Sequence, residues 1–63
     1  MRNVKYIRTN YNVPAYIGRR ILYTPENREG TIVGAHGAHL RIRLDGDDLV
    51  QTFHPVWGIR YLD

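Results

Sequence analysis

The chain has 63 residues, enough for one small domain that buries only about 60% of the surface its unfolded chain exposes. It contains no cysteine and no serine, which excludes disulfides, thiol chemistry and a serine nucleophile. The net charge of +3 is uneven: residues 1–25 carry five basic side chains and no acid, whereas residues 26–63 carry four basic side chains against six acids, a sum of −2. No stretch approaches the roughly 18 apolar residues of a membrane span and the first residues include no apolar leader, so we expect a cytoplasmic protein without a membrane partner.

Residues 1–17 combine tyrosine and basic side chains with Pro14 and show no sustained helical period. We therefore expect an extended basic arm over residues 1–17, ahead of a β domain over residues 18–63. Within that domain, short apolar runs are separated by glycine, proline, asparagine and aspartate, which is typical of strands joined by turns. The strands are predicted at residues 19–23, 30–35, 40–44, 49–53 and 59–62.

The run at residues 40–44 has the clearest strand pattern in the chain. Its leucines and isoleucine alternate with Arg41 and Arg43, as expected of a strand with one buried face. Both arginines should therefore face away from the core. Asp45 and Gly46 follow as a tight-turn signal, because both residue types tolerate the positive φ of hairpin turns.

The order of these elements indicates the fold class. Five short strands, with hairpins in the middle and a compact link at residues 54–58 before the last strand, resemble the SH3-like barrel. A curled sheet of this kind limits the length of exposed strand edges. We therefore predict an all-β fold, a small five-stranded SH3-like barrel with an extended basic N-terminal arm.

Residues 18–62 also resemble small SH3-like barrel proteins of bacteriophages and prophages. The motifs that carry this resemblance are Val13-Pro14-Ala15, Gly30-Thr31-Ile32-Val33-Gly34, Leu40-Arg41-Ile42-Arg43-Leu44-Asp45-Gly46 and Phe53-His54-Pro55-Val56-Trp57. The resemblance implies an accessory protein of a phage or mobile element that acts in the host cytoplasm, and it implies no particular biochemical activity.

A narrower part of the chain is similar to the core of the plasmid-borne type II dihydrofolate reductases, which are also SH3-like barrels. The matching segments are residues 18–22, 30–34, 50–53 and 55–56. That family works as a homotetramer in which a Val-Gln-Ile-Tyr tetrad from each subunit holds NADPH and dihydrofolate in a central pore. Here Thr52 and Phe53 replace the Ile and Tyr of the tetrad, and Tyr23 and Thr24 stand where the family has its pore lysine. The similarity implies a tetrameric reductase as an alternative.

Three histidines and an aspartate-rich turn are the candidate metal ligands. His36, His39 and His54 have no cysteine and no obvious fourth ligand to complete a zinc site. The aspartates of residues 45–48 lack the ligand spacing and the terminal glutamate of a calcium loop. We expect no metal, no cofactor, no catalytic residue and no enzymatic activity.

Outward-facing arginines with aromatic side chains nearby offer cations for phosphates and π-faces for bases. We therefore predict a non-enzymatic binding module whose partner is nucleic acid. The predicted nucleic-acid-binding residues are Arg19, Arg20, Arg41, Arg43 and Arg60, with Lys5, Arg8 and Arg2 added by the arm. The alternative is a module that binds a host or phage protein through this basic face or through the aromatic residues Tyr6, Tyr11, Tyr16 and Trp57. The small size leaves homo-oligomerisation open.

Overall fold

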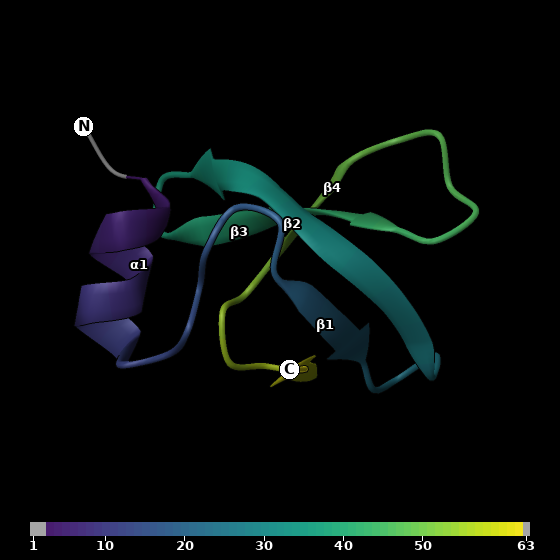
Figure 1. The fold of residues 1–63 in the computed structure, drawn as a ribbon, viewed down its shortest axis with the longest axis horizontal. Coiled ribbons are helices and arrows are strands. Elements are labelled where there is room, and N and C mark those ends of the chain that lie inside the picture. Colours follow the sequence, from purple (N-terminus) through teal and green to yellow (C-terminus); the bar gives the residue numbers. More distant parts are fainter. Residues whose placement is uncertain (1–2, 63) are drawn as a thin grey trace.

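The computed structural model describes residues 3–62, which form one short helix and five strands (Figure 1). The elements are α1 (Val4–Tyr11), β1 (Arg20–Tyr23), β2 (Arg28–His36), β3 (His39–Leu44), β4 (Gln51–Phe53) and β5 (Ile59–Tyr61). All neighbouring strands are antiparallel and form a single sheet in the order β4-β3-β2-β1-β5. The mostly β character and the five strands predicted from the sequence are confirmed, and β4 and β5 form the two edges of an open sheet.

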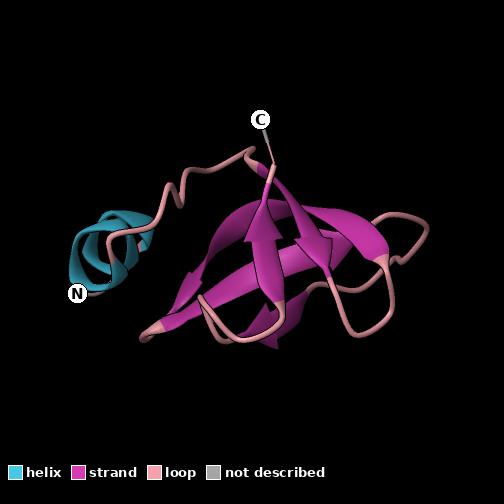
Figure 2. Ribbon diagram, turned by 90° about the horizontal axis from the view of Figure 1, so that it is seen from below, coloured by secondary structure: helices cyan, strands magenta, loops and turns pink. Residues whose placement is uncertain are grey.

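The sheet is strongly twisted and bent (Figure 2). The buried apolar side chains of its strands form one core cluster. Strand β3 alternates strictly between exposed and buried residues, with Leu40, Ile42 and Leu44 pointing inward as predicted. Ile21 of β1 and Ile32 of β2 are fully buried beside them. These apolar side chains hold the sheet in its bent form, because each removes its surface from water only when the strands curve around it.

The predicted extended arm is wrong for residues 4–11, which form helix α1 at one end of the sheet (Figure 1). The helix begins at Asn3, whose side chain accepts a hydrogen bond from the Tyr6 backbone N–H at 3.1 Å. It ends at Asn12, which has the left-handed φ of 54° that terminates many helices. Ile7 is fully buried in the same core as the strands, so the helix forms because its packing against the sheet stabilises it. No helix within residues 3–62 is long and apolar enough to cross a membrane.

The connection between β3 and β4 is longer than the tight Asp45-Gly46 hairpin that the sequence predicts. The turn does form there, with the Asp47 N–H donating to the Leu44 carbonyl at 3.0 Å. However, β4 begins only at Gln51, and the intervening Leu49 remains 75% exposed. Asp45 and Asp47 of this segment are bound by Arg20 and Arg28, which hold the chain in a loop before pairing resumes.

The link at residues 54–58 between β4 and β5 consists of bends without regular structure. Pro55 is buried in it, and its carbonyl accepts a hydrogen bond of 2.7 Å from the Tyr61 hydroxyl. Partial burial raises the pKa of the Tyr61 hydroxyl to about 12. This hydrogen bond fixes the link against the last strand.

Candidate nucleic-acid interface

The strand register brings several predicted site residues onto the outer face of the sheet. The alternation in β3 leaves Arg41 and Arg43 exposed on this face, as predicted. Arg43 is paired with Thr31 of β2, which is paired in turn with Arg20 of β1, so the three side chains lie in one row. Arg41 is paired with Gly34, where an added Cβ atom would have no heavy atom within 4 Å. The surface beside Arg41 is therefore open.

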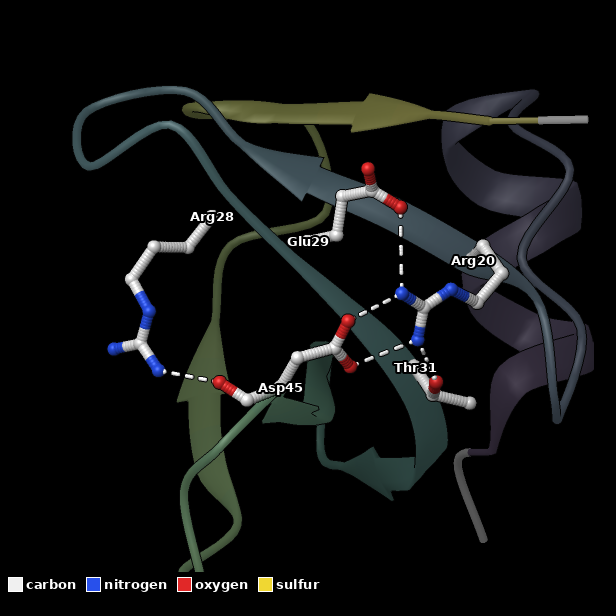
Figure 3. Close-up of polar contacts among 5 residues, drawn as sticks. All are labelled: Arg20, Arg28, Glu29, Thr31 and Asp45. Carbon is white, nitrogen blue, oxygen red and sulfur yellow. Dashed lines mark hydrogen bonds and ion pairs between the residues drawn. The ribbon is translucent and has the colours of Figure 1, made fainter.

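Arg20 is neutralised within this row (Figure 3). Its guanidinium donates two hydrogen bonds to the Asp45 carboxylate, one of them at 2.9 Å, and a third at 3.3 Å to Glu29. It also donates to the Thr31 hydroxyl at 2.7 Å. The hydrogen bonds with Asp45 raise the pKa of Arg20 and lower the pKa of Asp45, so both groups stay charged at neutral pH. Arg20 therefore links β1, β2 and the turn after β3. Because its guanidinium is already paired with two carboxylates, it is not available to a ligand.

Arg28 holds the same turn from the other side, a role that the sequence analysis did not assign to it. It donates to the Asp45 carbonyl at 2.8 Å and to the Asp47 carboxylate at 3.0 Å, and it lies 3.5 Å from the Glu26 carboxylate. Hydrogen bonding to Asp47 raises the pKa of Arg28. Two arginines thus take up four of the six acids of the chain, namely Glu26, Glu29, Asp45 and Asp47.

Because Arg20 and Arg28 bind these carboxylates, other arginines of the sheet remain available to a ligand. Arg41, Arg43 and Arg60 are exposed, and no carboxylate within residues 3–62 forms an ion pair with them. The register opposes Arg60 to Leu22 of β1, on the same outer face but towards the β5 edge. Arg19, also predicted for the site, is only half-exposed ahead of β1. The positive charge of the sheet is therefore concentrated on Arg41 and Arg43, with Arg60 at the far edge.

The basic residues near the N-terminus have different environments. Arg8 donates a hydrogen bond of 2.8 Å to the Ala15 carbonyl, and its guanidinium lies 4.0 Å from the centroid of the Tyr16 ring. These contacts fasten α1 to the segment that leads into the sheet, so Arg8 has a structural role. Lys5 is exposed on α1, and Arg2 lies outside the described residues.

Of the aromatic residues predicted for a protein interface, only two are well exposed. Tyr6 and Tyr11 are half-buried and packed against the core. Tyr16 is 51% exposed, and Trp57 is 73% exposed although its ring stacks on His54 at a centroid distance of 3.9 Å. The sequence predictions included Trp57 but not this stack. The three-residue spacing from His54 to Trp57, in a segment with a proline, is the signal for a bend that brings the two rings together.

The histidines lie at the β2–β3 turn and beside β4. His36 and His39 are cross-strand partners, and the ring centroids of His39 and His54 are 6.0 Å apart. Within residues 3–62, no three His, Cys, Asp or Glu side chains converge to hold a metal ion.

Of the residues that resemble the reductase tetrad, Gln51 and Phe53 lie on one side of β4, opposite Ile42 and Leu40, and Thr52 lies on the other side, opposite Arg41. Phe53 is paired with Leu40 and packs inward, where its ring meets Tyr23 edge-on at 4.9 Å. Gln51 is exposed and donates to Asp47 at 3.5 Å. Phe53 thus contributes to the core of its own chain.

No protein family, curated protein or solved structure matches the chain. The similarities to phage barrel proteins and to type II reductases therefore stay predictions.

Proposed function

We propose that this protein is a non-enzymatic module that binds nucleic acid through the outer face of β3. The observation that carries the proposal is the exposure of Arg41 and Arg43 on one face, without an ion pair to any carboxylate within residues 3–62. Side chains two residues apart on a strand are separated by roughly 6.6 Å, so the two guanidinium groups suit neighbouring phosphates of one backbone. The planar fork of an arginine also matches phosphate oxygens better than a lysine does.

The test is the salt dependence of binding, measured by fluorescence anisotropy with labelled DNA and RNA oligonucleotides. We expect retention at about 50 mM salt and a steep loss of affinity as salt is added. Arg41→Ala and Arg43→Ala should each lower the slope of log K against log salt by about 1, because each removes one phosphate contact.

Lys5, predicted as part of the site on an extended arm, lies instead on helix α1 at one end of the sheet. Lys5→Ala therefore removes the same unit charge away from the outer face of β3 and is the matched control. It should leave the slope unchanged. A loss with Lys5→Ala as large as that with Arg41→Ala would show diffuse attraction to net charge and would contradict a site on β3. Absence of binding to any oligonucleotide at about 50 mM salt would reject the proposal outright.

We also infer that the sheet has the SH3-like arrangement. The support is the strand order, in which β1 to β4 follow one another as neighbours and β5 returns to the free side of β1. The short link at residues 54–58 fits the same arrangement.

The reductase alternative requires a tetramer, whereas the proposed module does not. Light scattering that gives a monomeric mass would exclude the reductase. A tetrameric mass together with NADPH binding would favour it over the module.

A further inference from the structure

Trp57 presents one free aromatic face to solvent. Its ring is stacked on the His54 imidazole, with centroids 3.9 Å apart and an angle of 11° between the planes. A ring covered this closely on one side and still 73% exposed must have its other side open to water. Indole is the largest π-surface among side chains, and leaving it exposed forgoes the stabilisation that burial would give.

The orientation of this indole is fixed by His54, on which it stacks. His54 accepts a hydrogen bond of 3.2 Å at Nδ1 from the Val56 backbone N–H. Its ring also meets the ring of Tyr11 edge-on at 5.5 Å and that of His39 at 6.0 Å. The imidazole is therefore held by the backbone and by two other elements. A ligand that stacks on Trp57 pays little conformational entropy to order it, which favours binding.

The stack lies beside the start of β3, the strand that carries Arg41 and Arg43. The His54 ring is 6.0 Å from the ring of His39, the first residue of β3. Arg41 is two residues from His39 on the same face of β3. The aromatic stack is thus joined to the outer face of β3 through His39.

A free aromatic face matches a nucleotide whose base is not paired. In a duplex, both faces of each internal base are covered by its neighbours, so only a terminal pair can stack on a side chain. In a single strand every base has a face available, and stacking on an aromatic residue adds to the attraction of the phosphates. Resting on the proposed function, we propose that the outer face of Trp57 stacks an unpaired nucleobase while Arg41 contacts phosphates farther along the same strand, so that single-stranded nucleic acid is the ligand.

The experiment compares a thymine 12-mer with a duplex hairpin containing the same number of nucleotides, at about 50 mM salt. Trp57 is the only tryptophan in the chain, so its emission in the unmodified protein reports base stacking directly. Affinities of the variants are measured by anisotropy of labelled oligonucleotides. We expect the 12-mer to quench Trp57 and to bind several-fold more tightly than the hairpin.

Three variants separate stacking from general exposure. Trp57→Ala should weaken binding of the 12-mer by about 10-fold or more, with an unchanged salt slope. Trp57→Phe retains an aromatic face and should keep most of the affinity. Leu49→Ala is the matched control, because Leu49 is 75% exposed on the β3–β4 loop and should have no effect.

Two results would overturn the inference in distinguishable ways. If the hairpin binds as tightly as the 12-mer and Trp57→Ala behaves like Leu49→Ala, the base-stacking site is refuted. The proposed function would still stand in that case, provided that Arg41→Ala weakens binding. If neither oligonucleotide binds, the proposed function fails and the inference fails with it.

Discussion

Replacing Gly30 with alanine tests how closely β2 and β3 pack. A Cβ atom at Gly30 would lie 2.8 Å from the Arg43 backbone oxygen and 3.0 Å from both Ile42 Cγ2 and Leu44 Cδ2. The oxygen belongs to the paired strand and cannot move without disturbing the ladder. Inserting a methyl group into a filled core costs about 1–3 kcal/mol. A domain of this size has a total stability of about 3–9 kcal/mol, so the loss is substantial.

Gly34→Ala provides the matched control on the same strand. Nothing lies within 4 Å of its added Cβ atom, and replacing glycine at a compatible site gains about 0.4–1 kcal/mol by restricting the unfolded chain. Thermal unfolding followed by far-ultraviolet circular dichroism should show Gly30→Ala melting about 5–20 °C below the unmodified protein and Gly34→Ala at or above it. Melting temperatures for the two variants within about 2 °C of each other would refute this close packing of β2 against β3.

Three other predictions concern the helix and the last strand. Ile7→Ala should cost about 2–5 kcal/mol in urea unfolding, because Ile7 is fully buried, whereas a dispensable arm would show no loss. Asn3→Ala should lower the free energy of unfolding by about 0.5–2 kcal/mol and speed amide exchange at Tyr6, because the Asn3 side chain accepts a hydrogen bond from the Tyr6 N–H. Unchanged exchange at Tyr6 would contradict the cap. The pKa of about 12 at Tyr61 exceeds the unfolded value near 10, so the neutral hydroxyl stabilises the fold fully below pH 10, and this contribution is lost as pH rises from 10 to 12. Urea midpoints over that range should fall less for Tyr61→Phe than for the unmodified protein, and equal falls would refute the assignment.

The sequence predicted the strands well where one face of a strand is buried. The alternation around Arg41 and Arg43 reports burial directly, because a period of two has no other common structural cause. The helix was missed because Pro14 suggested an interrupted, extended segment. Its signals were nevertheless present: Val4, Ile7 and Tyr11 have helical spacing, and an asparagine precedes them. Pro14 lies beyond the end of the helix, where a proline is common.

The candidate site was predictable only in part. The outward direction of the β3 arginines follows from local alternation, whereas the neutralisation of Arg20 depends on Asp45, which is 25 residues away and approaches only through the strand register. The His54–Trp57 stack likewise depends on the bend of an irregular link, which no periodic pattern encodes. Contacts between distant segments therefore decided which predicted cations remain available.

Arg20 is ion-paired whereas Arg41 and Arg43 have no ion pair within residues 3–62, and this difference makes the salt dependence of binding interpretable. Added salt screens the Arg20–Asp45 pair as well as any bound phosphate. The side chains of that pair are 38% and 57% exposed, and ion pairs at such exposure contribute little to stability. The apolar core, which salt does not weaken, should hold the sheet together across the titration. A steep fall in affinity with salt therefore measures the loss of phosphate contacts at Arg41 and Arg43, and unchanged circular dichroism at each salt concentration verifies that assignment.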